Sequence, residues 1–555
     1  MIEHLNMRLV STMLPLMAAS VLAACGGGTT VVADVPSVTS QAVPLTVPKV
    51  VACAASDTPE AALQGQVPAA VRASGFKGYN CNLSLVGQYQ GEGGNWSSAT
   101  FTDGAGRTCA YHSTPGQWTG NAAGTQFPTG FPTDAARDRS NPGAPVIDIT
   151  DRTKPVRVTS LTSPAMMDSW ESLRVSDRRQ ILIADNGLNG GANGGPEVDI
   201  YDLSGDCRTP QLMGSVAVGT GLNGGVTTKT PVLGHEGNIS PDGLTYYIGD
   251  IKASFYHAVD VGNTTKPKLI ASYDVGTNMP AGTRVHGLSV SNDGNRMYGV
   301  LIGAAVPAGQ VIPLANASNG FAIFDTSEVQ ARKAGATIKL ISKAVYQDGA
   351  TAQLTIPVTI SGKQYLVMVD EAGSAGLGTD VNAKVACAAG LSPFPMARIY
   401  DISDEKNPTP VSKMMLETHD PKNCAAVTPD IAGLAVFTYG SHYCSVDNRD
   451  NATALACSYF NSGVRVFDIR DPVRPKEIAY FNPPAVKKLP PSSNHYLYGG
   501  KSAVVGGPDW CASRLDFDFA KKQLTTMCHD NGLMVLQFAS NTWPFAGSTA
   551  SKSQN

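Results

Sequence analysis

The sequence has 555 residues, of which 42% are hydrophobic and only 16% charged, with a formal net charge of −3. A chain of this length can bury a large core, and beyond the N-terminus it has no apolar run long enough to span a membrane. The near-neutral charge, without a dense stripe of lysine and arginine, argues against a nucleic-acid partner. The 57 glycines and 36 prolines favour short strands and turns over long helices.

The N-terminal segment has the features of an export signal. Residues 1–24 carry a short basic region followed by an apolar stretch, which is typical of a signal peptide. The stretch ends in Leu-Ala-Ala-Cys, which resembles the lipobox of bacterial lipoproteins with Cys25 as the lipidated residue. Because Gly26 rather than Asp follows, the resemblance favours the outer membrane or cell surface over the inner membrane. The alternative is an ordinary cleaved signal in which Cys25 has no role.

The segments that flank the main body have compositions unsuited to a core. Residues 25–51 are glycine, threonine, valine, proline and serine with almost no charge, which predicts a flexible tether. Residues 52–82 follow as an N-terminal lead-in, and residues 541–555 are expected to be a disordered tail.

The cysteine count agrees with export. Setting Cys25 aside, ten of the 11 cysteines remain, an even number that predicts disulfides in an oxidising compartment such as the periplasm or the cell surface. A thiolate metal site is the alternative, although the chain has no Cys-x-x-Cys pair. The repeat described next makes three pairings plausible, and the connectivity otherwise stays open: Cys444 with Cys457, Cys511 with Cys528, and Cys387 with Cys424.

A repeated motif is the strongest internal signal. It is an apolar, β-branched strand that ends in aspartate and is often followed within several residues by proline and a second strand. A fixed motif at loosely regular spacing indicates a repeat architecture. The six copies are centred on Asp148, Asp202, Asp260, Asp325, Asp401 and Asp468.

A second hairpin lies between the copies, with turns such as Ser240–Gly243, Ser291–Gly294 and Thr428–Asp430. The full unit is therefore four antiparallel strands, and radial repetition of such units protects their edges. We predict an all-β fold over residues 83–540, a seven-bladed β-propeller of four-stranded antiparallel blades, with two β-sandwiches as the alternative. The predicted blades are 96–160, 170–217, 235–275, 286–345, 352–416, 423–482 and a last blade from Cys511.

The last blade contains only three strands of its own. Leu83–Gln90 precedes the first blade and is the obvious donor of the fourth strand, which would close the ring. Gln537 stands where the motif calls for aspartate, so the closing blade departs from the other six.

These features resemble the LVIVD-repeat β-propeller family, which includes many exported or lipid-anchored bacterial proteins. The resemblance covers roughly residues 80–540 and rests on the repeated motif, on CSYFNSGVRVFDIR at Cys457–Arg470, and on CHDNG at Cys528–Gly532. It implies a propeller and says little about activity, because propellers host many unrelated functions.

Several histidines should meet on one face of such a propeller, where strand one of each blade begins and strand two ends. His235 and His286 share a position at the start of strand one in consecutive blades, and Glu171 takes it in the blade before. The predicted ends of strand two carry His112, Asp185, Asp250, Asp370, His442 and His529.

Imidazoles from several strands around a narrow axis could hold copper, zinc, manganese or iron, with Glu171 or Glu236 as a ligand or a support. Distantly similar propellers, the selenium-binding and methanethiol oxidase proteins, use a histidine-lined site, although no motif matches residue by residue. The alternative is that each histidine caps a strand end. The candidate ligands are His112, His235, His286, His442, His529 and Glu171.

Two functions from different classes follow. One is a membrane-anchored binding or scaffold module for a protein, a glycan or a small ligand on the loop-rich face. The other is a metal-dependent enzyme, such as an oxidoreductase, with the histidines at the mouth of the channel. No Gly-x-Ser-x-Gly elbow supports a serine hydrolase, and the reaction, substrate and oligomeric state stay open.

Overall fold

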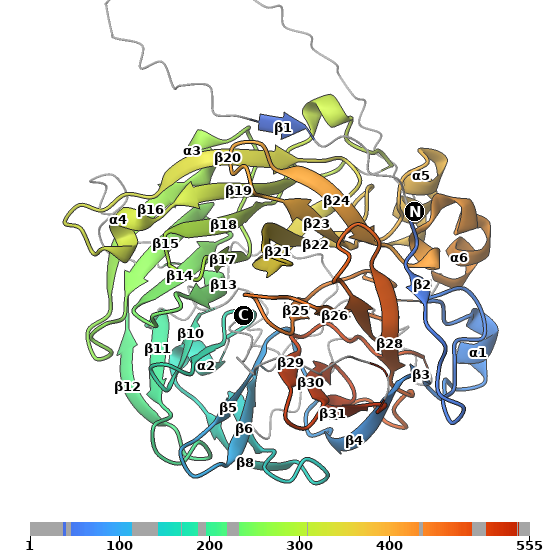
Figure 1. The fold of residues 1–555 in the computed structure, drawn as a ribbon, viewed down its shortest axis with the longest axis horizontal. Coiled ribbons are helices and arrows are strands. Elements are labelled where there is room, and N and C mark those ends of the chain that lie inside the picture. Colours follow the sequence, from blue (N-terminus) through green and yellow to red (C-terminus); the bar gives the residue numbers. More distant parts are fainter. Residues whose placement is uncertain are drawn as a thin grey trace, which may run out of the picture. The chain divides into compact units, whose positions relative to one another are not determined.

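The chain folds into a seven-bladed β-propeller of four-stranded antiparallel sheets, which confirms the predicted fold class. In Figure 1 the blades follow one another around the ring in chain order, from blue through cyan, green and yellow to red. The computed structural model describes residues 37–39, 46–113, 143–218, 232, 234–431, 434, 437–490, 507–540 and 542, apart from 168, 187–195 and 308. Cys25, the predicted signal peptide and nearly all of the predicted tail lie outside the described residues.

Six blades are built from four consecutive strands each. The first three blades are β5 (Ser98–Thr102), β6 (Thr108–His112), β7 (Ala144–Asp148) and β8 (Val156–Leu161); β9 (Arg174–Ser176), β10 (Ile181–Asp185), β11 (Val198–Asp202) and β12 (Gln211–Val216); and β13 (Gly234–Ile239), β14 (Thr245–Asp250), β15 (Phe255–Asp260) and β16 (Lys268–Asp274). The next three are β17 (Leu288–Val290), β18 (Arg296–Leu301), β19 (Gly320–Asp325) and β20 (Lys339–Val345); β21 (Ala350–Ile360), β22 (Lys363–Ala372), β23 (Ala397–Asp401) and β24 (Thr409–Met414); and β25 (Cys444–Val446), β26 (Ala454–Ser458), β27 (Val464–Asp468) and β28 (Lys476–Asn482).

The seventh blade closes the ring with a strand from the other end of the chain. It contains β29 (Asp516–Asp518), β30 (Gln523–Cys528), β31 (Gly532–Phe538) and then β4 (Leu83–Tyr89). β4 pairs antiparallel with β31, and Figure 1 shows the two side by side in blue and red. The prediction that Leu83–Gln90 donates the closing strand is confirmed.

The repeated aspartate ends the third strand of each of the first six blades. Its carboxylate accepts a hydrogen bond from the backbone N–H two residues later, at 2.8–3.1 Å in all six copies. This Asx turn starts the connection to the fourth strand. In the seventh blade the Gln537 amide instead donates to the carbonyl of Lys522 at 2.8 Å.

The turns between strands one and two follow the prediction in some blades and not in others. Gly243 and Gly294 have φ of +71° and +77°, a conformation that glycine adopts without strain. Thr428–Asp430 is not a hairpin turn, because it lies in the helix α6 (Cys424–Ile431). Strand one of the sixth blade therefore begins at Cys444 and not near residue 423.

The reason for this difference is tertiary packing. A disulfide joins Cys424 to Cys387 in the neighbouring helix α5 (Asp380–Ala388). Val427 and Ile431 of α6 are buried in a small apolar cluster that includes Ala383 of α5. The helical pair overrides a local sequence that is typical of a turn. The remaining short helices are α1 (Ala69–Ala73), α2 (Pro164–Met167), α3 (Val275–Asn278), α4 (Ser327–Gln330), and the 3₁₀ turns Leu314–Asn316, Glu417–His419 and Pro421–Asn423.

All ten cysteines after Cys25 are paired. The three predicted pairings are confirmed, and Cys53–Cys81 and Cys109–Cys207 are added to them. The thiolate metal site that the sequence left open is wrong, because no cysteine of the described chain keeps a free thiol. Five disulfides indicate an oxidising, extracytoplasmic compartment.

The segment predicted to be a flexible tether contains two short strands. β1 (Ser37–Thr39) adds in parallel to β20, and β2 (Lys49–Val50) adds in parallel to β28. β3 (Tyr79–Cys81) of the lead-in also pairs with β28. The uncharged composition builds no core here, and these strands form because the outer strand of a blade offers unpaired backbone groups.

The lead-in is held to the sixth blade by a buried ionic group. The Arg465 guanidinium is fully buried and contacts the carboxylates of Glu60 and Glu477, the latter at 3.1 Å. It also stacks over the ring of Tyr480, 4.7 Å from the centroid. A buried cation with two carboxylate partners fixes residues 52–82 against the ring.

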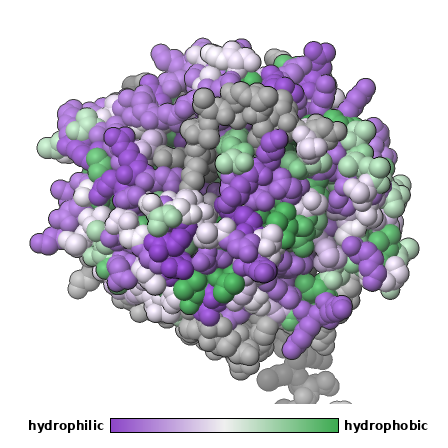
Figure 2. Space-filling model, turned by 60° about the horizontal axis from the view of Figure 1, so that its bottom comes forward, coloured by the Kyte–Doolittle hydropathy of each residue, from purple (hydrophilic) through white to green (hydrophobic). Residues whose placement is uncertain are grey.

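The surface mixes polar and apolar residues. Figure 2 shows hydrophilic residues over most of one face, with hydrophobic residues in small separate groups. Several of the exposed large apolar side chains lie on the outer strands of different blades, for example Val156 of β8 and Leu212 of β12, and others lie in α5 or in loops. In the part of the chain that the structure describes, no helix is both long and apolar enough to cross a bilayer.

Candidate metal centre

One register position recurs at the start of strand one in successive blades. In β13, Gly234 pairs with Asp250 and Glu236 pairs with Gly249, so His235 between them occupies a β-bulge. A bulge leaves its residue out of the ladder and re-aims its side chain. Here the imidazole of His235 reaches Glu171 of the preceding blade, with Nε2 3.1 Å from Oε2.

His286 and Glu171 take the same position in the blades on either side. His286 lies between Arg284, which bridges to Ile302, and Leu288, which pairs with Gly299. Glu171 comes directly before Ser172, whose hydroxyl bonds the end of β10. The sequence-based equivalence of Glu171, His235 and His286 is therefore reproduced by the strand register.

His442 reaches the same position in the sixth blade by a different strand from the one predicted. Its backbone N–H donates to the carbonyl of Ser458 at the end of β26, and β25 begins two residues later at Cys444. His442 thus lies at the start of strand one, and its predicted place at the end of strand two is wrong. The error follows from the misplaced start of the sixth blade.

We call Glu171, His235, His286 and His442 the central cluster. Its three imidazoles converge on the carboxylate of Glu171. The Nε2 atoms of His235 and His286 lie 3.1 and 3.3 Å from Oε2 of Glu171, and Nε2 of His442 lies 3.3 Å from Oε1. The potential ligand atoms of Glu171, His235 and His286 lie within 4.8 Å of one another. All four residues are buried, with 7% exposure at most.

Neighbouring groups fix the orientation of two of the imidazoles. Nδ1 of His286 lies 3.3 Å from Glu236, whose carboxylate also contacts the guanidinium groups of Arg174 and Arg514 at 3.1 and 2.6 Å. Nδ1 of His442 lies 2.6 Å from the carbonyl oxygen of Ala512. A partner on Nδ1 leaves Nε2 as the nitrogen that can bind a metal.

The charges of the central cluster depend on one another. Burial would raise the pKa of Glu171, but the positive charges of His286 and His235 hold it well below its usual range. Burial would lower the pKa of His442, but the carboxylates of Glu171 and Glu371 raise it to about 9. Glu171 and Glu236 likewise raise the pKa of His286 against burial, whereas burial and His286 lower the pKa of His235.

This donor set fits a transition metal. Three neutral imidazoles and one carboxylate are ligands that zinc, copper, iron and manganese accept, at about 2.0–2.2 Å for zinc. The Nε2 atoms of the three imidazoles, each from a different blade, lie 3.1–3.3 Å from the carboxylate oxygens of Glu171 in a fourth blade. His235, His286, His442 and Glu171 would hold the ion, and Glu236 would orient His286.

Aromatic side chains wall the central cluster on one side. The ring of Trp96 lies 4.9 Å from His442, and the ring of Trp170 lies 5.9 Å from His235. With Phe437, Phe460 and Trp510 they form one buried cluster. Such a wall lowers the local polarity and strengthens electrostatic interactions within the site.

Two of the predicted ligands lie outside the close group. His112 ends β6, and its Nδ1 lies 2.9 Å from the carbonyl of Ser113. His529 follows β30 and packs edge-on against Trp96 at 4.6 Å. Among the described residues, the group of potential ligand atoms within 4.8 Å of one another contains neither of them. It also omits His442, which joins the central cluster through Oε1 of Glu171.

The aspartates at the ends of strand two serve the framework. Asp185 accepts a hydrogen bond from the hydroxyl of Tyr246 at 2.9 Å, and Asp370 contacts the guanidinium of Arg398 at 2.5 Å. Nδ1 of His257 bonds a serine of its own blade, and its Nε2 lies 3.7 Å from Asp250.

Several residues around the site were missed by the sequence analysis. Glu371 lies 3.6 Å from Nε2 of His442, and Arg174 and Arg514 hold Glu236. Trp96 precedes Ser97, the residue before the Ser98–His112 pair of the first blade, and so stands at the position of His235. Counting back from the repeated aspartate through the strand pairing would have found Trp96.

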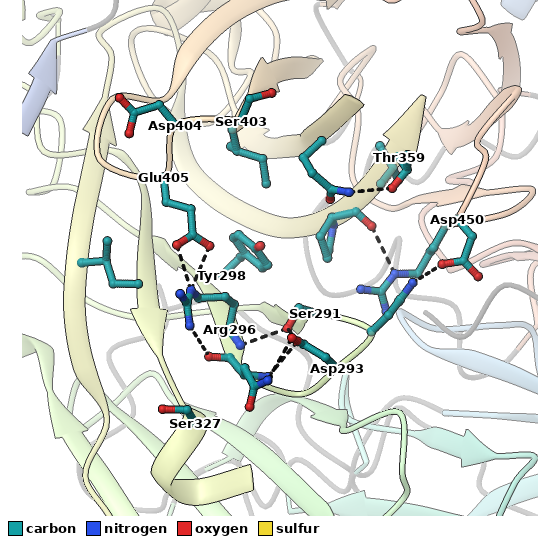
Figure 3. A pocket seen from close by; sticks show the side chains of 18 of the residues that line it. Ser291, Asp293, Arg296, Tyr298, Ser327, Thr359, Ser403, Asp404, Glu405 and Asp450 are labelled. Atoms are coloured by element: carbon teal, nitrogen blue, oxygen red, sulfur yellow. Dashed lines mark hydrogen bonds and ion pairs between the residues drawn. The ribbon is translucent and has the colours of Figure 1, made fainter. Parts of the chain in front are cut away.

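A second feature lies at the other ends of the strands. A cavity of about 1120 Å³ opens between the fourth, fifth and sixth blades, lined by turns at the ends remote from the central cluster. Figure 3 shows Arg296 and Glu405 pointing toward each other across it, at 2.8 and 2.9 Å. Its polar lining includes Ser291, Asn292, Asp293, Tyr298, Asp404 and Asp450.

Comparisons with known proteins add little to this description. No protein-family model matches the chain, and no curated protein matches its sequence. A 6-phosphogluconolactonase candidate from Bacteroides uniformis is similar in structure, with 11% identity and a TM-score of 0.44 over 73% of this chain and 90% of that one. A second one, from Bacteroides fragilis, has 10% identity and a TM-score of 0.43 over 73% and 88%.

The β-propeller domain of Cps50 (Swd1) from Myceliophteria thermophila is also similar, with 9% identity and a TM-score of 0.38 over 72% of this chain and 90% of that one. At these values we draw no functional argument from any of the three.

Proposed function

We propose that this chain is a metal-binding β-propeller whose central cluster holds one transition-metal ion. The observation that carries the proposal is the convergence of three imidazole Nε2 atoms, from His235, His286 and His442, on the carboxylate of Glu171. Burying three imidazoles around one carboxylate costs free energy unless the rings coordinate a bound metal ion. The contacts at Nδ1 of His286 and His442 leave Nε2 as the metal-binding nitrogen of both rings. A metal so placed supplies Lewis-acid or one-electron chemistry, depending on the ion.

Metal analysis of the purified full chain tests this proposal. After export, purification and dialysis we expect about one equivalent of copper, zinc, manganese or iron by mass spectrometry of the elements. The double variant His235→Gln, His286→Gln should lose it, because it removes two of the four donors. His112→Gln is the matched control, since it alters a buried histidine that lies on the same face but outside the central cluster. Absence of stoichiometric metal, or its retention in the double variant, would overturn the proposal.

The propeller is a fold that commonly serves as a binding module. We further propose that this protein is lipid-anchored through Cys25. We also propose that it belongs to the LVIVD-repeat family. The disulfides and the six repeated aspartates support export and the family. Mass spectrometry of the mature N-terminus and membrane fractionation of Cys25→Ser test the anchor. An unmodified N-terminus, or a Cys25→Ser protein that stays in the outer-membrane fraction, would refute it.

The cavity near Arg296 favours a second function, the binding of a polar ligand such as a glycan. Its volume of about 1120 Å³ exceeds that of most small-ligand sites, and hydroxyl, amide and carboxylate groups beside Tyr298 suit sugar hydroxyls. Glycan arrays followed by calorimetry on the wild type and on Asn292→Ala test this function. Weaker binding in the variant is expected, and no bound glycan on the wild type would reject it.

A further inference from the structure

Gln353 occupies in the fifth blade the position that His235 occupies in the third. In β21, Ala352 pairs with Asp370 and Leu354 pairs with Val369, so Gln353 lies in the bulge between them. The bulge of β13 around His235 has the same register, with Asp250 in the place of Asp370. Blades related by rotation about one axis direct equivalent side chains toward that axis.

The fifth blade lies between the blades that carry His286 and His442. The backbone carbonyl of Gln353 accepts a hydrogen bond at 3.0 Å from Gly287, the residue after His286. A Cβ atom on Gly287 would lie 2.2 Å from that carbonyl, so this close approach requires glycine. On the other side, Glu371 of the fifth blade lies 3.6 Å from Nε2 of His442.

The amide of Gln353 is buried and unpaired within the described residues. The residue has 0% exposure, and neither Oε1 nor Nε2 has a hydrogen-bond partner there. Native proteins rarely leave both halves of a buried amide unpaired, because each lost hydrogen bond to water costs free energy. An apolar side chain would fill the same space without this cost.

Four donors of the central cluster already suffice for the ion, and a neutral amide is a weaker ligand than imidazole or carboxylate. We propose that Gln353 is a positioning residue that holds a small exchangeable ligand on the metal, such as water, hydroxide or another small anion. The amide N–H donates a hydrogen bond to the atom by which the ligand binds the metal. The amide oxygen accepts a hydrogen bond when that ligand is water. This inference rests on the proposed metal site.

The consequence is a metal centre with one coordination position open to exchange. Catalytic metal sites differ from structural ones in keeping such a position. Gln353 would then determine which small ligand occupies the fifth position, while the central cluster determines which ion is bound.

The experiment uses the full chain loaded with Cu(II) and titrated with azide. Azide binding is followed by its charge-transfer absorption and by electron paramagnetic resonance. We expect one copper per chain in the wild type, in Gln353→Leu and in Gln364→Leu. Azide affinity should fall about tenfold in Gln353→Leu, as expected for one hydrogen bond to a charged group. Gln364→Leu, a matched change at the turn end of β22, should leave the affinity unchanged.

The outcomes separate the two proposals. Failure of the wild type to bind copper overturns the proposed metal site and this inference with it. Normal copper content with unchanged azide affinity in Gln353→Leu overturns only the inference. Loss of copper in Gln353→Leu would make Gln353 a ligand and also overturn it. If Gln353→Leu does not fold, Gln353→Asn, which shortens the side chain by one methylene, is expected to show the same loss of azide affinity and is judged by the same criteria.

Discussion

The buried His419 should make the fold sensitive to mild acid. It ends the 3₁₀ turn Glu417–His419 with 0% exposure. Its Nε2 lies 2.8 Å from the carbonyl oxygen of Tyr439, to which it donates, and its Nδ1 accepts from the backbone N–H of Leu416 at 3.2 Å. The bond from Leu416 needs the neutral imidazole, because a protonated Nδ1 cannot accept.

The sign and size of the effect follow from the pKa of His419. Burial lowers this pKa to about 4 from an ordinary value of about 6.5. The unfolded chain therefore takes up the proton first, so stability is complete above about pH 6.5 and falls as the pH drops toward 4. At about 1.4 kcal/mol per pH unit, the free energy of unfolding should decrease by about 3 kcal/mol over this range.

Urea unfolding at pH 7.5 and pH 4.5, with the disulfides kept oxidised, measures this loss. His419→Gln removes the titrating group, and its loss of stability between the two pH values should be smaller than that of the wild type by about 2–3 kcal/mol. Other groups that titrate in this range, including the buried His112, contribute to both proteins and cancel in the comparison. Equal pH dependence in the wild type and the variant would refute the reasoning.

Three further predictions concern the framework. Arg465→Met should lower the free energy of unfolding by about 3–5 kcal/mol, because two buried carboxylates lose their cation. It should also expose the lead-in to protease. An unchanged denaturation midpoint in urea would contradict this. Replacing both cysteines of Cys109–Cys207 by serine should destabilise by about 4–5 kcal/mol, more than the same change in Cys444–Cys457, because the sequence separation is 98 against 13; thermal melts that rank the two variants in the opposite order would count against it. Gly249→Ala should reduce metal content without altering a ligand, because its Cβ would meet the backbone oxygen of His286 at 2.0 Å; Gly205→Ala, whose Cβ meets nothing, is the control.

The fold could be predicted well because its main signals are local. The repeated aspartate forms its hydrogen bond within two residues, so each copy indicates the end of a third strand whatever the rest of the chain does. A last blade with only three strands was enough to require a donor strand from elsewhere. The turn at Thr428–Asp430 was wrong because long-range contacts, including the Cys387–Cys424 disulfide, stabilise a helix there.

The site could be predicted only in part, because it depends on strand register. The alignment was correct for Glu171, His235 and His286, because each stands before a regular hairpin of strands one and two. His442 was assigned to the wrong strand because the predicted start of the sixth blade was too early. Gln353 was missed although its bulge has the register of that around His235, because a glutamine is not a typical metal ligand and the burial of its amide without a partner is seen only in the folded chain that the structure describes. The roles of Arg174 and Arg514 depend on contacts between blades.

The pairing of β4 with β31 also limits how the chain can fold. Leu83 and Phe538 are partners in one ladder, so β4 is synthesised long before the strand that completes its blade. Until β31 arrives, one edge of the ring is open, and an unpaired strand edge invites association with other chains. Closure is therefore a late step with a high contact order. A chain cut short before residue 532 would leave six blades without closure, and we expect it to be recovered as aggregate or degraded.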